Sequence, residues 1–188
     1  MNIQQLKDKL KSIALLEAII SPEWEYRYFS YDSNWSEDEE MASMRDGEGN
    51  TWFSVFKKDI IFYKCISKDD GLIKNHKDIK QMIPEKFNSF INEEAFHTNI
   101  ATKISIFDNN KWLEFGISNV NHIIDLKTIQ HWKAIDYKDW ADKYYEKDLD
   151  LTSIQNIFTH SIDEHIVKSL NNELCFNDIE HEIEEIGY

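Results

Sequence analysis

The residues of this sequence that could do chemistry are, above all, its carboxylates, and the densest run of them follows Trp35. Glu37, Asp38, Glu39 and Glu40 stand in consecutive positions. A catalytic pair of carboxylates is normally held inside a cleft, where burial shifts the pKa of one of them. A cation-binding loop needs alternating oxygen ligands and a turn-forming glycine, and this run has neither. The pattern therefore predicts a solvated loop that could contact a partner.

The other reactive residue types show no catalytic or metal-binding spacing. The seven histidines form neither HxH nor HExxH, and His160 and His165 would lie about 500° apart around a helix. The sequence contains no GxSxG, and neither Cys65 nor Cys175 lies in a catalytic signature. We therefore expect no catalytic residue, no metal and no cofactor.

Arginine and tryptophan are the residue types whose positions favour specific contacts. Only two arginines occur, Arg27 and Arg45, and Arg45 ends a short strand pattern beside Asp46. An arginine in that setting is predicted to be at least partly buried and paired with a carboxylate. Most of the six tryptophans are expected in the core, but Trp35 and Trp132 fall near predicted loops, where an exposed ring would be a contact residue.

The charge of the chain limits its partners. It carries 21 Lys and Arg against 35 Asp and Glu, a net charge of −14, which disfavours nucleic acid and anionic membranes because both bind basic surfaces. Residues 136–188 hold 14 acidic and 4 basic side chains, a net charge of −10. That excess is either a solvated surface or a docking face for a protein partner with a basic surface. In the second case Glu182, Glu184 and Glu185 are candidate binding residues, and reversing their charge should slow association more than it lowers stability.

Length and composition predict one domain, since 188 residues contain no Pro-, Gly- or Ser-rich linker. Residues 1–135 should hold a helix and an antiparallel sheet, and residues 136–188 an acidic helical part packed on it. The apolar run 13–20 contains Glu17 and is too short for a signal peptide or a membrane span. The two cysteines indicate buried thiols in a reducing cytoplasm, so we expect a cytoplasmic protein. Its oligomeric state stays open.

Hydrophobic periodicity predicts the elements. Apolar residues recur with the helical period over 3–20 and stop at Pro22. Alternating aromatic residues predict a strand over 24–35. The Gly47 and Gly49 turn should join strands over 41–45 and 51–56, with one glycine at positive φ.

The rest of the chain predicts more strands, a short helix and then helices only. A strand over 60–66 and a helical segment beginning at Pro84 precede a second hairpin, formed by 101–107 and 112–117. Four helical segments close the chain, with Asp150 and Ser161 as N-caps. The fold class is therefore α+β: an N-terminal helix, an antiparallel sheet of about five or six strands and a C-terminal helical cluster.

One part of the sequence resembles a group of uncharacterised bacterial proteins. Those proteins carry a RYYSF-type strand, a tryptophan, an EMASMRDGSG-type hairpin and then an aromatic strand. The matching segments here are RYFSY at 27–31, Trp35, EMASMRDG at 40–47 and IPEKF at 83–87, and the resemblance extends more loosely into the terminal helices around Tyr144 and Tyr145. The group has no established activity to carry over, and the Lys64-Cys65-Ile66 strand end departs from it, because a histidine often stands there. By type, this acidic, aromatic-rich chain is similar to the immunity proteins of bacterial polymorphic toxin systems.

Two functions remain open on these grounds. The first is a non-enzymatic acidic binding protein, such as an immunity protein that neutralises a basic bacterial toxin. The second is a small-ligand-binding protein or enzyme whose pocket lies between sheet and helices around Arg45. The absence of a catalytic motif favours the first function.

Overall fold

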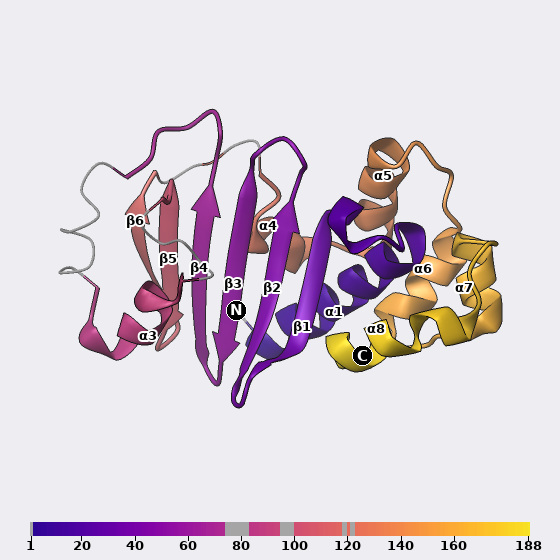
Figure 1. The fold of residues 1–188 in the computed structure, drawn as a ribbon, viewed down its shortest axis with the longest axis horizontal. Coiled ribbons are helices and arrows are strands. Elements are labelled where there is room, and N and C mark those ends of the chain that lie inside the picture. The colour runs from indigo at the N-terminus through magenta and orange to yellow at the C-terminus, as the bar shows by residue number, and fades with distance from the viewer. Residues whose placement is uncertain (1, 74–82, 95–99, 118–119, 121–122) are drawn as a thin grey trace. The chain divides into compact units, whose positions relative to one another are not determined.

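The protein is described by a computed structural model that covers residues 2–73, 83–94, 100–117, 120 and 123–188. An N-terminal helix, a six-stranded antiparallel sheet and C-terminal helices confirm the predicted α+β class (Figure 1). The chain divides into two compact units: a sheet unit, Trp35–Ile123, and a helical unit, Asn2–Asn34 with Ile124–Tyr188. The helical unit thus joins the first helix to the last ones, whereas the sequence grouped that helix with the sheet.

The helical unit is built around α1, Ile3–Ile20, which is buried on all sides from Ser12 onward. Asn2 caps its first turn through Gln5 N, and Pro22 follows its end. Helices α4, α6, α7 and α8 pack against α1, and α5 packs against α6 (Figure 1). The bounds of these helices are Leu126–His131 for α4, Ala134–Tyr144 for α5, Leu151–Phe158 for α6, Glu164–Leu170 for α7 and Glu180–Ile186 for α8.

Several acidic residues of this unit serve as helix caps. The carboxylates of Asp125, Asp150 and Asp163 each accept a backbone N–H of the first turn of α4, α6 and α7. Asp178 does the same at Cys175 N, beside the 3₁₀ helix η4, Phe176–Ile179. Part of the C-terminal acidity is therefore structural, since a capping carboxylate satisfies N–H groups that a helix end leaves free.

The sheet follows the order of the chain, and its strands are antiparallel. Its first strand, β1, begins in the helical unit and ends in the sheet unit. The strand bounds are Phe29–Ser36 for β1, Glu39–Arg45 for β2, Thr51–Lys57 for β3, Ile60–Ile66 for β4, Lys103–Asp108 for β5 and Lys111–Gly116 for β6. From β2 to β6 the register is given by the pairs Arg45–Thr51, Thr51–Ile66, Cys65–Lys103 and Lys103–Gly116.

Inside the sheet unit, apolar side chains of β3, β4 and β5 share one face of the sheet. Val55, Phe62 and Ile104 on that face form a core with the side chains of η2, Glu85–Phe87, and α3, Asn88–Asn92. The rings of Phe62 and Phe90 stack at 5.3 Å, which joins α3 to the strands. The helical segment predicted to begin at Pro84 is confirmed.

The first hairpin turn is confirmed in its predicted conformation. Gly47 has φ of +73° and Gly49 of +109°, values that favour glycine. The carboxylate of Asp46 accepts the backbone N–H groups of Glu48 and Asn50, at 2.8 and 3.0 Å, and closes the loop. The second predicted turn also holds, since Asn109 and Asn110 connect β5 to β6 with positive φ.

Three predicted details are wrong. Residues 24–26 form the 3₁₀ helix η1, Trp24–Tyr26, because Tyr26 N and Arg27 N bond back to Glu23 O and Trp24 O. The strand therefore starts at Phe29, and Trp24 is exposed rather than in the core. Ser161 caps no helix, since Asp163 takes that place at α7.

The two cysteines differ in burial. Cys65 is buried as expected, but Cys175 is only partly buried, because it lies in the exposed segment before η4. His76, His97 and His122 lie outside the described residues. No helix among the described residues is long and apolar enough to cross a membrane.

Candidate functional site on the helical unit

A buried carboxylate lies at the centre of the helical unit. Glu17, on α1, has no exposed surface, and its side chain accepts four hydrogen bonds. Oε1 accepts from the Tyr137 hydroxyl at 2.8 Å, and Oε2 from the Tyr145 hydroxyl at 2.5 Å. Oε2 also accepts the backbone N–H groups of Tyr28 and Phe29, at 2.8 and 3.3 Å. A single side chain thus joins α1, the start of β1 and helix α5.

Burial decides the protonation of this network. It raises the pKa of Glu17 above its usual value, and the hydrogen bonds from Tyr145, Tyr137 and the backbone lower it only in part. Burial, and then the charge of Glu17, raise the pKa of Tyr137 and Tyr145, so both phenols remain donors at neutral pH. The network is therefore a set of donors around one acceptor, and its acceptor, Glu17, has no exposed surface on which to meet a substrate.

Aromatic rings surround this carboxylate and reach the surface. Tyr28 meets Trp140 edge-on at 4.8 Å and Tyr144 at 4.9 Å. Trp140 and Tyr144 stack at 5.3 Å, and Tyr144 also contacts the ring of Tyr145 at 4.9 Å. Such pairs add about 0.5–1.5 kcal/mol each beyond burial. The outermost ring, Tyr144, is thereby held by three neighbours.

The exposed end of this ring cluster is an aromatic face, which we define as Trp24, Tyr26 and Tyr144. Their exposed fractions are 55%, 63% and 41%. Trp24 and Tyr26 belong to η1, and Tyr144 is the last residue of α5. The two elements are neighbours because Tyr28, two residues after η1, contacts Tyr144. Exposed aromatic rings held on a rigid support are typical of protein contact surfaces.

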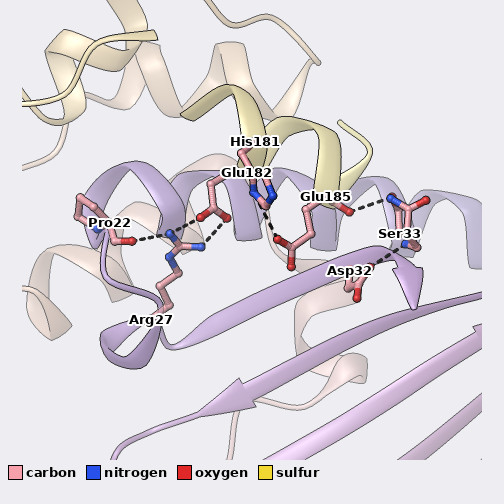
Figure 2. A network of polar contacts seen from close by, with 8 residues as sticks. Pro22, Arg27, Asp32, Ser33, His181, Glu182 and Glu185 are labelled. Atoms are coloured by element: carbon pink, nitrogen blue, oxygen red, sulfur yellow. Dashed lines mark hydrogen bonds and ion pairs between the residues drawn. The ribbon is translucent and has the colours of Figure 1, made fainter. Parts of the chain in front are cut away.

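Arg27 anchors the segment that carries the aromatic face. Its side chain is 4% exposed and makes a bidentate ion pair with Glu182 of α8, with Nη1 at 2.6 Å and Nη2 at 2.8 Å from the carboxylate oxygens (Figure 2). Nε donates to Ser21 O at 3.0 Å, and Nη2 donates to Pro22 O at 2.6 Å. The guanidinium therefore fixes both the chain before η1 and the first turns of α8.

Glu185 lies beside that ion pair in an acidic neighbourhood (Figure 2). Burial, and then the charges of Glu182 and Asp32, raise the pKa of Glu185, while His181 and Arg27 act in the opposite direction. His181 Nδ1 is 3.8 Å from Glu185 Oε2. Among the described residues, no group of three or more His, Cys, Asp or Glu could hold a metal ion.

The predicted C-terminal site residues differ in what they can do. Glu184 is exposed on α8, as expected of a binding residue. Glu185 is only partly exposed, and Glu182 is held by Arg27. For Glu182 we now expect charge reversal to lower stability, because a lysine there would face a buried guanidinium.

The predicted hairpin residues lie in the sheet unit. Glu37 and Asp38 are exposed in the turn between β1 and β2, but Glu39 and Glu40 belong to β2 and are partly buried. Lys57 Nζ pairs with Asp38 at 3.0 Å and with Glu39 at 2.8 Å, so part of this run is neutralised. Trp35 packs against the core of the sheet unit and offers a partner only part of its ring.

Arg45 is partly buried, as predicted, at the end of β2 opposite Thr51. The expected ion pair of Arg45 stays a prediction. Two surface cavities lie in the helical unit, of about 760 and 380 Å³, and Arg45 lines neither of them. Neither cavity therefore supports the expected pocket around Arg45.

Sequence reasoning missed three parts of this site: Glu17, the aromatic face and the Arg27–Glu182 pair. Glu17 had a usable signal, since it is the only charged residue in the apolar run 13–20. The exposure of Trp24 and Tyr26 was not predicted, because aromatic and charged residues alternate in this short 3₁₀ helix as they would in a strand. Arg27 and Glu182 are 155 positions apart, and no local pattern connects them.

Comparisons with known proteins do not indicate a function for this chain. A scan against family models and searches of curated proteins and of solved structures found no match. Function is therefore inferred from the residues, charges and contacts described above.

Proposed function

We propose that this chain is a non-enzymatic binding protein whose acidic helical unit binds the basic surface of another protein. The helical unit holds 20 Asp and Glu against 10 Lys and Arg, a net charge of −10, while the sheet unit has 15 against 11, a net charge of −4. Neutralising a basic toxin, in the manner of an immunity protein, is the specific form of this function that we favour.

The observation that carries the proposal is the set of acidic side chains left over after structural use. Caps and ion pairs employ many of the acids, including Asp142 and Asp148, which bind Lys138 at 2.5 and 2.9 Å. Seven exposed carboxylates of the helical unit make no hydrogen bond or ion pair with any described residue: Glu23, Glu25, Asp139, Glu146, Glu173, Glu180 and Glu184.

Unpaired surface carboxylates add nothing to the fold, but they create a field that reaches beyond the molecule. Charges of one sign attract an oppositely charged partner and accelerate its docking, an effect that salt screens. Buried aromatic and ion-pair contacts keep the surface in place. A preformed acidic surface of this kind fits rapid capture of a basic protein.

The test is capture of partners from the native host with the tagged chain at low salt. We expect a protein with a basic surface to bind at about 0.05 M salt and to elute as salt rises toward about 0.5 M, where the Debye length is only a few ångströms. Identification is by mass spectrometry, and the purified protein must then rebind. Captured proteins that resist salt elution, or that are acidic themselves, would contradict the proposal.

A further inference from the structure

The aromatic face is a group of large hydrophobic side chains that the helical unit leaves exposed. Among the described residues, seven large hydrophobic side chains are exposed, and Trp24, Tyr26 and Tyr144 are three of them. Tyr26 is the most exposed of the seven, at 63%. Trp24 and Tyr26 lie on the same short 3₁₀ helix, η1. Tyr144 lies close to η1 because its ring contacts that of Tyr28. This grouping differs from the scattered apolar residues that any surface has.

The face is held in place before any partner arrives. Tyr144 is packed against Tyr28, Trp140 and Tyr145, and η1 is followed directly by the anchored Arg27. Binding would therefore cost little ordering of the backbone beside η1 or of the Tyr144 ring, since both are held by buried contacts. A rigid aromatic surface of this kind is suited to flat groups that stack on it.

Acidic side chains accompany the rings on both elements. Glu23 and Glu25 alternate with Trp24 and Tyr26, and Glu146 follows the last residue of α5 by two positions. These three carboxylates are exposed and have no partner among the described residues. Two lysines, Lys143 and Lys147, are close in sequence to Tyr144. Lys147 Nζ donates a hydrogen bond to Ile20 O at 3.1 Å. Beside Trp24, which Glu23 and Glu25 flank, the local charge is negative, because Glu182 neutralises Arg27.

We propose that the aromatic face and the carboxylates of Glu23, Glu25 and Glu146 bind arginine side chains of the basic partner, an inference that rests on the proposed function. A guanidinium is planar and weakly hydrated, so it stacks on an aromatic ring while its N–H groups bind carboxylates. A lysine ammonium has no flat face and is more strongly hydrated. A second copy of this chain fits poorly, because it would bring the same carboxylates to the face.

The test uses two labelled peptides of equal length. One contains arginines and the other lysines, and in both peptides Gly-Ser separates the basic residues. Fluorescence anisotropy measures their dissociation constants with the full chain at low salt. We expect the arginine peptide to bind more tightly than the lysine peptide. Trp24→Ala should raise the dissociation constant of the arginine peptide by about 5- to 30-fold. Trp24→Phe should lie between Trp24→Ala and the wild type.

The matched control is Ile135→Ala, which removes a side chain 42% exposed on the same unit, in the first turn of α5. Equal effects of Trp24→Ala and Ile135→Ala would overturn the inference while leaving the proposed function standing. A dimer in sedimentation that Trp24→Ala dissociates would overturn it too, since a second copy would then cover the face. Failure of both peptides to bind at low salt would contradict the proposed function itself.

Discussion

Replacing Arg27 by alanine should destabilise the protein by about 3 kcal/mol, the lower end of the cost of removing one partner of a buried ion pair, because the Glu182 side chain is still 25% exposed. The guanidinium makes four hydrogen bonds, two of them to Glu182 and one each to the carbonyls of Ser21 and Pro22. Alanine would leave the Glu182 carboxylate without its cation and the two carbonyls without their donor. Urea denaturation followed by circular dichroism measures the loss.

Two further variants separate the ion pair from general damage. Arg27→Lys keeps the charge but cannot reproduce the planar fork, so it should lose an intermediate amount of stability. The double variant Arg27→Ala/Glu182→Gln should lose less than the sum of its single changes, because the two side chains share one interaction. An Arg27→Ala protein within about 1 kcal/mol of the wild type would show that the pair is not structural.

Glu17→Ala should cost about 3–5 kcal/mol, because each buried donor left without an acceptor costs about 1–3 kcal/mol. The donors that lose their acceptor are the Tyr137 and Tyr145 hydroxyls and the backbone N–H of Phe29, while the Tyr28 N–H keeps a hydrogen bond of 3.4 Å to the Tyr145 hydroxyl. Glu17→Gln is the matched variant, since it keeps the volume and one acceptor oxygen. It should be much less destabilising than alanine.

The pH dependence of stability tests the protonation of Glu17. Its pKa in the folded protein is raised, mainly by burial, so the folded state holds the proton more tightly than the unfolded state. Stability from this residue is therefore complete below its usual pKa of 4.5 and is lost as pH rises through the raised value. Glu17→Gln cannot titrate, and the wild type should lose stability relative to it over that window.

Tyr137→Phe sharpens this test because the Tyr137 hydrogen bond lowers the pKa of Glu17. Without that donor, the pKa of Glu17 should rise further, and the loss of stability should move to higher pH. A difference between wild type and Glu17→Gln that does not change with pH would show that Glu17 has the same pKa folded and unfolded.

The sequence predicted those features that depend on neighbours along the chain. The helix over 3–20, both hairpins and the Asp150 cap follow from periodicity, turn residues and capping chemistry, which act over a few positions. All of them are present in the structure. The α+β class could be predicted because a helix, a run of antiparallel strands and a run of helices can pack together in only a few architectures.

The site depended on pairs far apart in the chain, which a single sequence does not connect. Glu17 meets Tyr137 across 120 positions, and Arg27 meets Glu182 across 155. Charge counting placed Glu182 with Glu184 on a docking face, yet only the fold reveals that Glu182 is already paired. Charge alone thus located the acidic part of the chain but not which acids are free.

The central claim is that unpaired acids of the helical unit attract a basic partner, and the association rate with the captured partner tests it most directly. Stopped-flow rates should fall about tenfold or more between about 0.05 and 0.5 M salt, with a much smaller change in dissociation rate. At low salt, Glu180→Lys/Glu184→Lys should slow association, while Glu85→Lys/Glu94→Lys, the same charge change on exposed acids of the sheet unit, should slow it far less. An association rate that is equal at both salt concentrations and in both variants would contradict the proposed function.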